Sequence, residues 1–240
     1  MSQQLAIRTV DSWEEDDAIL SSAIKRLDGP LEILEAGCGR RWTLDLEGVD
    51  CRLTGIDLDA DALESRVSAV GDLDEAILGD LSVKGTIPEA RYDVIFSSYV
   101  LEHVHEAEAA LENMVKGLKP GGLLLLRIPD RDSVQGWTVR NTPHSVHIAY
   151  YRHVADYPDA GKPGHPPYPT VHAPIVSRRS IRDFCDKHGC EIVEEHGHTA
   201  YVQGTALKTR LIRSYVRTMS LLSFRRLAWK HNNLTYIIRK

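Results

Sequence analysis

Two glycines followed by an aspartate have the residue types and the spacing of a cofactor site. Gly37 and Gly39 lie in the segment LEAGCGR, directly after an apolar run, and Asp57 ends a second apolar run twenty residues after Gly37. Glycine permits a tight turn from strand to loop and lets backbone N–H groups come close to a ligand, because it has no Cβ. An acidic side chain at the tip of the next strand can accept hydrogen bonds from both ribose hydroxyls. This spacing predicts that the chain binds a cofactor that contains adenosine.

The order of apolar and amphipathic segments predicts how these residues are positioned. Short apolar runs of strand type alternate with helical patterns, and such alternation predicts a parallel sheet covered by helices on both faces. The strands are expected at residues 31–35, 52–56, 76–78, 92–97, 123–128, 190–195 and 234–238. The helices are expected at residues 13–27, 59–70, 106–118, 180–187 and 204–229. The pattern therefore indicates an α/β fold in which the glycine loop follows the first strand.

Between residues 131 and 176 this alternation stops. The stretch holds seven of the eleven prolines and five of the eleven histidines. An irregular segment of this length inside a folded protein is more often functional than not. We expect it to shape the binding site.

Length and composition indicate a soluble protein of the cytoplasm. The 240 residues correspond to one large domain, and no apolar run approaches the ~18 residues of a membrane span. The N-terminus lacks the basic and then apolar layout of a secretory signal. The four cysteines have neither CxxC nor zinc-finger spacing, which favours reduced thiols.

Charge is unevenly distributed along the chain. The whole chain has 29 Lys and Arg against 34 Asp and Glu, whereas residues 201–240 have nine Lys and Arg and no acidic residue. Such a basic tail can contact nucleic acid or an anionic surface. The net charge of −5 argues against a protein that mainly binds phosphate backbones. The helix at 204–229 is therefore interpreted as a packing element, with a homodimer through this helix as a hypothesis.

Further segments follow the glycine loop in a fixed order: Asp80 in LGDL, the strand YDVIFSS, the loop VLEHV at residues 100–104, and the turn KPGG. With these segments, residues 31–128 resemble the class I S-adenosylmethionine-dependent methyltransferases. Dehydrogenases share the glycine loop and the ribose aspartate, but they do not usually show the later segments together.

The resemblance implies a Rossmann-like, seven-stranded and mostly parallel sheet with an antiparallel last strand, helices on both faces, and insertions after strand five and between strands six and seven. The chain would be a single domain. Its parts would be an N-terminal helix (1–30), the cofactor-binding core (31–130), the acceptor-binding insertion (131–176) and a C-terminal part with the basic helix and the final strand (177–240).

The resemblance also assigns S-adenosylmethionine as the cofactor and gives roles to individual residues. Asp57 would hold the ribose, Asp80 would accept from the adenine amino group, Leu81 would contact the ring, and Ser97 would lie beneath the methionine part. The loop departs from the family pattern at residues 40–42, where RRW stands in place of a common third glycine. The complete set of implied cofactor residues is Glu35, Gly37, Gly39, Asp57, Leu58, Asp80, Leu81 and Ser97.

Methyl transfer to an oxygen acceptor needs a base, because an alcohol is a poor nucleophile until its proton is removed, and histidine suits this role near neutral pH. The candidates are His144, His147 and His103. His144 is the first choice, since NTPH at residues 141–144 is a turn-like segment shortly after strand five, whose carboxyl end borders the expected crevice. Three further histidines are expected to shape the acceptor pocket: His153, His165 and His172.

Two carboxylates at the end of strand five, Asp130 and Asp132, could bind a divalent cation. A bound Mg²⁺ would lower the pKa of an acceptor hydroxyl. A polar strand end without a metal is the alternative for this pair. Aromatic residues that could line the pocket are Trp42, Tyr99, Trp137, Tyr150 and Tyr151.

An insertion rich in His, Tyr, Pro and Arg suits a polar acceptor with hydroxyl groups, and a sugar or oligosaccharide fits this description. The chain looks similar to actinobacterial O-methyltransferases of saccharides, including those of methylmannose polysaccharide. The alternatives are a phenolic or polyketide acceptor, a nucleic-acid methyltransferase, and a non-catalytic cofactor-binding protein. Nucleic acid is disfavoured as a partner, because the sequence has no Asn-Pro-Pro-Tyr motif, zinc finger or RNA-binding module.

Overall fold

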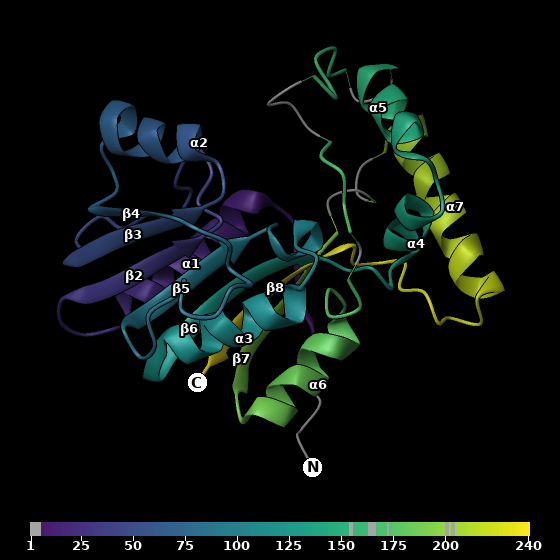
Figure 1. Ribbon diagram of the computed structural model, residues 1–240. Coiled ribbons are helices and arrows are strands. Elements are labelled where there is room, and N and C mark those ends of the chain that lie inside the picture. Colours follow the sequence, from purple (N-terminus) through teal and green to yellow (C-terminus); the bar gives the residue numbers. More distant parts are fainter. Residues whose placement is uncertain (1–5, 154–155, 163–166, 172, 200–201, 203–204) are drawn as a thin grey trace.

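The centre of the protein is an eight-stranded sheet (Figure 1). The computed structural model describes residues 6–153, 156–162, 167–171, 173–199, 202 and 205–240. The strand order is β1-β7-β8-β6-β5-β2-β3-β4, in which β8 runs antiparallel to β6 and β7 and all other neighbours are parallel. The strands are β1 (Arg8–Val10), β2 (Leu31–Ala36), β3 (Cys51–Asp57), β4 (Glu75–Leu78), β5 (Tyr92–Ser98), β6 (Leu118–Pro129), β7 (Glu191–His198) and β8 (Asn233–Arg239).

Helices cover both faces of the sheet. The helices are α1 (Trp13–Lys25), α2 (Ala60–Glu64), α3 (Ala107–Gly117), α4 (Val134–Arg140), α5 (His144–His153), α6 (Arg178–His188) and α7 (Leu207–Leu222), with a π-helical turn η1 (Ser65–Val70) and a 3-10 turn η2 (Leu101–His103). Because successive side chains of a strand point to opposite faces, Leu124 and Leu126 of β6 join the core under α3 and α6, and Leu123 and Leu125 join the core under α1. Both faces are apolar, as buried parallel strands require.

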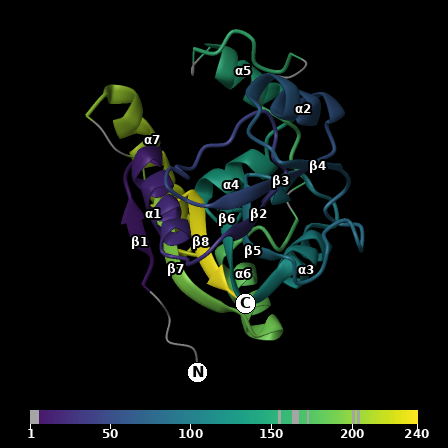
Figure 2. The ribbon, with the colours of Figure 1, turned by 90° about the vertical axis from the view of Figure 1, so that its left-hand side faces the viewer.

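Helix α1 begins at the carboxyl edge of the parallel strands. The short strand β1 pairs in parallel with the end of β7, where Val10 lies opposite His198, and the chain then turns into α1 (Figure 2). Ser12 caps the helix, since its Oγ accepts a hydrogen bond from the Glu15 N–H at 3.1 Å. Trp13 and the first turn of α1 are thereby placed at the same edge as the glycine loop.

Three helices form a lobe beside this edge, which we call the helical lobe (α4, α5 and α7). Its small core contains Val134 of α4, Val216 of α7 and Val202, which precedes α7 in the chain, with Leu227 and Trp229 packed against it. Figure 1 shows the lobe away from the sheet, and α4 packs against α7 within it. No described residue of α5 is buried, so this helix packs only loosely against the rest of the lobe.

The seven predicted strands are confirmed, and the parallel sheet with an antiparallel last strand is confirmed with them. The sheet has an eighth strand, β1, which sequence analysis did not predict, because three residues are too short for a readable alternation. Residues 1–30 are therefore not only an N-terminal helix. The predicted helix at 59–70 is divided into α2 and the π-helical turn η1, and the predicted helix at 204–229 is shorter, as α7 ends at Leu222.

The segment from 131 to 176 is more regular than predicted. It holds α4 and α5, and His144 is the first residue of α5 instead of part of an irregular turn. The prolines and histidines obscured the helical pattern of HSVHIAYYRH, which has only a weak apolar face. Among the described residues, no helix is both long enough and apolar enough to cross a membrane.

Candidate active site

The loop after β2 is shaped by its glycines. Gly37 has a φ of +76°, and its N–H and that of Cys38 donate to the carbonyl oxygen of Ile56 at 2.8 and 3.1 Å. A Cβ at Gly37 would lie 2.4 Å from Cγ2 of Val100, which leads into the turn η2. Glycine is therefore required here by both backbone conformation and close packing.

The Asp57 carboxylate lies at the end of β3 and joins this loop to the start of α2. Its Oδ2 accepts from the Gly39 N–H at 2.8 Å, and its Oδ1 accepts from the Asp59 N–H at 2.9 Å. Each carboxylate oxygen can accept two hydrogen bonds, so each keeps capacity for a ligand hydroxyl. The side chain is half-buried at the edge of the sheet. This geometry fits the ribose of an adenosine cofactor.

A buried ion cluster supports the glycine loop from below. The Arg66 guanidinium is fully buried, lies 2.9 Å from Oε2 of Glu35, and donates to Oδ1 of Asp72 at 2.7 Å and to the carbonyl oxygen of Cys38 at 2.8 Å. Burial raises the pKa of Glu35 to about 8, and Arg66 offsets only part of this effect. Glu35 thus contacts Arg66 beneath the loop, and its role as a cofactor contact stays a prediction.

The predicted adenine site lies at the end of β4. Oδ1 of Asp80 accepts hydrogen bonds from the N–H and Oγ of Ser82 at 2.8 and 2.7 Å, and these bonds lower the pKa of Asp80. The side chain of Leu81 is buried, and its carbonyl oxygen accepts from Nδ2 of Asn113 at 2.9 Å. Leu58 is exposed beside Asp57. Asp80 keeps its second oxygen for an amino group.

Polar atoms without a hydrogen-bond partner gather where β5 ends. Ser97 Oγ, the Tyr99 hydroxyl and Oε2 of Glu102 are buried, and none of the three has a partner among the described residues. Tyr99 also has a positive φ of 57°. Buried polar atoms are nearly always paired in native proteins, so an unpaired group invites a bound ligand or water. These atoms fit a polar group held between β5 and η2.

His103 directly follows Glu102 in the chain. Its Nδ1 lies 2.7 Å from the carbonyl oxygen of Pro169, which can only accept, so Nδ1 carries a proton and Nε2 of the neutral ring is free to accept one. Nε2 lies 4.0 Å from Oε1 of Glu102. Burial raises the pKa of Glu102 to about 7. His103 is thereby oriented by the segment at residues 167–171, whose Val171 N–H also donates to the Glu102 carbonyl oxygen.

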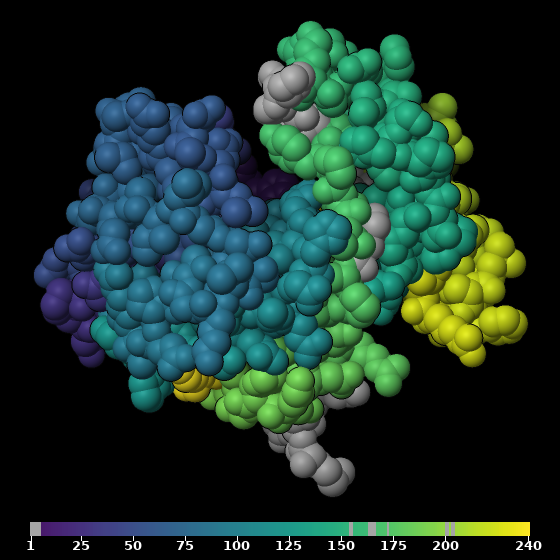
Figure 3. Space-filling view, viewed as in Figure 1, coloured from purple at the N-terminus to yellow at the C-terminus, as the bar shows by residue number. Residues whose placement is uncertain are grey.

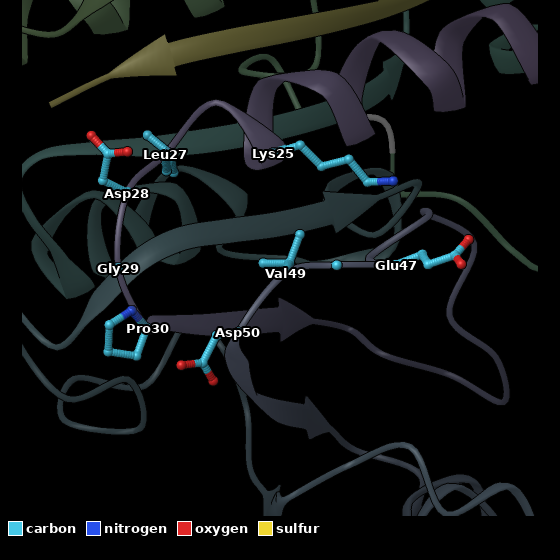
Figure 4. A pocket seen from close by; sticks show the side chains of 9 residues that line it. Lys25, Leu27, Asp28, Gly29, Pro30, Glu47, Val49 and Asp50 are labelled. Carbon is cyan, nitrogen blue, oxygen red and sulfur yellow. The ribbon is translucent and has the colours of Figure 1, made fainter.

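A cleft opens above the carboxyl edge of the sheet. Figure 3 shows it between the blue residues around α2 and the green residues of the helical lobe, with N-terminal atoms in dark purple at its floor. Another hollow lies at the opposite edge, between the end of α1 and the amino ends of β2 and β3, and is lined by Lys25, Gly29, Pro30 and Asp50 among others (Figure 4). Ligand sites of open α/β sheets form at the carboxyl edge, so the cleft is the candidate site.

The match to known families agrees with this geometry. The family model described as a methyltransferase domain matches residues 12–195. This chain belongs to the methyltransferase domain family. The match includes the loop at Gly37, Asp57, Asp80 and the turn η2.

Curated relatives match over part of their length. A probable S-adenosylmethionine-dependent methyltransferase of Mycolicibacterium smegmatis is 32% identical over 42% of this chain and 38% of that protein. A ubiquinone biosynthesis O-methyltransferase of Rickettsia bellii is 29% identical over 47% and 52% of the two chains, and a trans-aconitate 2-methyltransferase of an Azoarcus species is 27% identical over 56% and 54%. The chain thus spans about half, or less, of the length of these relatives.

Solved structures confirm the methyltransferase fold. The structure of a SAM-dependent methyltransferase from Archaeoglobus fulgidus has a TM-score of 0.55 at 17% identity and is covered over 95% of both chains. At this identity the likeness is one of fold alone. It confirms the Rossmann-like α/β architecture.

In this methyltransferase domain, His144 and His147 lie on α5, within the helical lobe. Their rings are 6.0 Å apart in an edge-to-face arrangement, and Nε2 of His147 lies 2.5 Å from Oγ1 of Thr142. Burial lowers the pKa of His147, and the nearby His144 lowers it further. His153 ends α5, and the predictions for His165 and His172 lie outside the described residues.

The predicted Mg²⁺ site of the methyltransferase is not supported. Asp130 is buried, and its Oδ1 accepts the Asp132 N–H at 3.0 Å, while the Asp132 side chain is largely exposed and lies 3.9 Å from Nε of Arg131. No cluster of three or more His, Cys, Asp or Glu occurs among the described residues. Both carboxylates directly follow the end of β6.

Sequence analysis missed a buried polar cluster at the floor of the methyltransferase site. Asp16 of α1 accepts from Nε of Arg127 at 2.6 Å and from Oγ1 of Thr235 at 3.0 Å. Burial alone would raise the pKa of Asp16, but hydrogen bonds from His196 and His198 and the charge of Arg127 hold it well below its ordinary value. The one available signal was an arginine at the end of the apolar strand LLLLRIP, because an unpaired charge is not buried.

Trp13 was also missed as a site residue. Its ring stacks on His198 at 4.2 Å and meets the Tyr99 ring edge-on at 5.7 Å, although 42% of the residue is exposed. An exposed aromatic ring in a fixed position beside the end of β5 can contact an acceptor. In the sequence, Trp13 could be identified only as the first residue of a predicted helix.

Proposed function

We propose that this chain is an S-adenosylmethionine-dependent O-methyltransferase acting on a polar small molecule. The observation that carries the proposal is the Asp57 carboxylate, which accepts from Gly39 and Asp59 and keeps hydrogen-bonding capacity at the carboxyl edge. The residues fit the cofactor there, because Asp57 would hold the ribose, Asp80 the adenine, and the glycine loop the remainder. When bound, S-adenosylmethionine supplies a methyl group activated by a sulfonium, so the protein's main task is alignment.

His103 is the base that this geometry favours, ahead of His144. Val100 packs on the glycine loop and leads into η2, so His103 is close in the chain to the cofactor loop, whereas His144 and His147 belong to the helical lobe. The Pro169 carbonyl oxygen fixes the Nδ1 proton, and Nε2 is then ready to take the proton of an acceptor hydroxyl. His144 and His147 would instead contact the acceptor from across the cleft.

The acceptor proposed first is a sugar or oligosaccharide, including a mannoside of methylmannose polysaccharide. The lobe that forms one wall of the cleft carries histidine, tyrosine and threonine side chains, which suit hydroxyl groups. A phenolic or polyketide acceptor is the second candidate, since a relative is a ubiquinone biosynthesis O-methyltransferase and Trp13 offers an exposed ring at the floor.

The test is a transfer assay with methyl-labelled S-adenosylmethionine and separate pools of mannosides, phenols, carboxylic acids and RNA. We expect label in the mannoside pool, and its position is then read from the fragmentation of the product by mass spectrometry. If label appears in the phenol pool alone, the acceptor is phenolic and not a sugar. Absence of label from every pool, with the cofactor bound, would favour a non-catalytic cofactor-binding protein.

A further inference from the structure

Helix α7 is apolar on two sides, and only one of them is covered by the described chain. On the inner side, Ile212, Val216 and Met219 pack against Val134 and Trp229 of the helical lobe. On the outer side, large apolar residues are exposed to solvent, from Leu207, which is 71% exposed, to Phe224, which is 89% exposed. The outer apolar residues of the helix are Leu207, Leu211, Leu221 and Leu222, and Phe224 follows just after the helix ends.

Arginines accompany these apolar residues. Arg210, Arg217, Arg225 and Arg226 are exposed, and none of them forms an ion pair with a described residue. Arg217 lies over the Trp229 ring at 4.6 Å, a cation–π contact that supplies no anionic partner. Residues 201–240 contain no Asp or Glu at all. The helix therefore combines exposed leucines with a purely positive charge.

This combination argues against two other partners. A second copy of the chain would bring the same arginines together on both sides of an interface, and like charges in contact disfavour association. A nucleic acid would pair with the arginines but would leave the leucines exposed, because recognition of its backbone is electrostatic. The partner must be anionic and must also accept aliphatic side chains.

We propose that the outer face of α7 docks on the surface of an anionic phospholipid bilayer. The helix would lie in the plane of the interface, with its leucines at the acyl boundary and its arginines at the lipid phosphates. The inference does not depend on methyl transfer. It replaces dimerisation as the role of this helix.

Helix α5 also carries exposed aromatic side chains, and one of them lies near the start of α7. Lys208 Nζ lies 5.8 Å from the Tyr150 ring centre, and Val146, Tyr150 and Tyr151 of α5 are exposed. Tyrosine is favoured at membrane interfaces, where one end of the ring is apolar and the other is wet. In Figure 3 the yellow residues of α7 lie on the side of the lobe away from the cleft, so docking would leave the mouth of the cleft open.

Flotation of the full chain with vesicles tests the proposal. Vesicles of phosphatidylcholine alone are compared with vesicles that contain phosphatidylglycerol as an anionic component, at low and at high salt. We expect flotation with the anionic vesicles only, and a clear loss at high salt, because screening weakens the arginine contacts. Absence of flotation with anionic vesicles at low salt would overturn the proposal.

Matched variants separate the two kinds of contact. Leu211→Ser/Leu222→Ser and Arg225→Glu/Arg226→Glu should each lower the partition coefficient roughly tenfold or more. Val83→Ser and Lys84→Glu make similar changes at exposed positions of the loop that follows β4. They should leave the partition coefficient between vesicles and buffer unchanged. All the changed side chains are exposed, and circular dichroism checks that each variant is folded.

Two other partners, a second copy of the chain and a nucleic acid, would give different results. A dimer in analytical ultracentrifugation without vesicles that is lost in Leu211→Ser/Leu222→Ser would make this face an interface between copies and overturn the bilayer. Binding to a DNA duplex that depends on Arg225 and Arg226, with vesicle flotation unaffected by the leucine variant, would also overturn it.

Discussion

The Arg66 guanidinium donates a hydrogen bond to the carbonyl oxygen of Cys38 across 2.8 Å, and so holds the cofactor loop from within the protein. Arg66 lies in the π-helical turn η1, which ends at Gly71 in the left-handed conformation. Its other donors reach Glu35 and Asp72. The loop at Gly37–Gly39 is thus fixed on both sides, by Arg66 below and by Asp57 at the edge.

Replacement of Arg66 by Met should destabilise the protein strongly. It leaves the carboxylates of Glu35 and Asp72 without their partner, and removal of one member of a buried ion pair costs about 3–5 kcal/mol in the free energy of unfolding. Urea unfolding measures this. The matched control is Arg52→Met, whose side chain is about half exposed in its ion pair with Glu75, so the pair should contribute less than about 1 kcal/mol. Equal losses in the two variants would contradict a supporting role for Arg66.

Gly37→Ala should also destabilise the protein, and Val100→Ala should restore part of the loss. The new Cβ would lie 2.4 Å from Cγ2 of Val100, and the φ of +76° is unfavourable for alanine. Removal of the valine methyl groups relieves the clash but not the backbone strain. The free energies of unfolding of both single variants and the double variant measure the coupling. Strict additivity would show that the two residues do not touch.

Glu102→Gln should change how stability depends on pH. Burial raises the pKa of Glu102 to about 7 in the folded state from an ordinary 4.5. The unfolded chain therefore loses this proton first, so ionisation of Glu102 lowers stability progressively as pH rises from about 4.5 to about 7. The difference corresponds to roughly 3 kcal/mol.

Glutamine carries no charge, so the variant should gain about that amount relative to the parent between pH 4 and pH 8. Chemical denaturation of both proteins at the two pH values gives the difference, in which other titrating groups cancel. A difference that is the same at pH 4 and pH 8 would place Glu102 in contact with solvent.

His103→Gln should lower kcat about 10²–10⁴-fold without change in cofactor affinity, because general-base catalysis contributes about that much. His144→Gln and His147→Gln should mainly raise KM for the acceptor, since α5 belongs to the opposite wall. The transfer assay with the acceptor found in the screen supplies these constants. A parental kcat in His103→Gln, with kcat lost in His144→Gln, would return the role of base to His144.

The central sheet could be predicted because its strands are apolar on both faces and are separated by glycine and proline turns. The order of Gly37, Asp57 and Asp80 predicted the edge at which a cofactor would bind, and this site stays a prediction. Arg66 could not be foreseen, because its contact with Cys38 spans 28 residues and depends on a π-helical turn that has no readable sequence signal.

The helical lobe was less predictable than the sheet. Helix α5 has no buried residue, so no apolar periodicity marked it, and its histidines together with the prolines of the surrounding segment suggested a loop. His103 was among the candidate bases, but its orientation depends on Pro169, which is distant in the chain. The cluster of Asp16, Arg127 and Thr235 joins α1, β6 and β8, so only the fold brings it together.

The most direct test of the proposed function is isothermal titration calorimetry with S-adenosylmethionine on the parent chain, Asp57→Ala and Asp50→Ala. Asp50 lies at the opposite edge of the sheet, beside the hollow in Figure 4, and is the control. Loss of charge-assisted hydrogen bonds to the ribose should weaken binding roughly 10–100-fold in Asp57→Ala, with Asp50→Ala unchanged. No binding to the parent chain, or equal affinity in all three proteins, would contradict a cofactor site at Asp57.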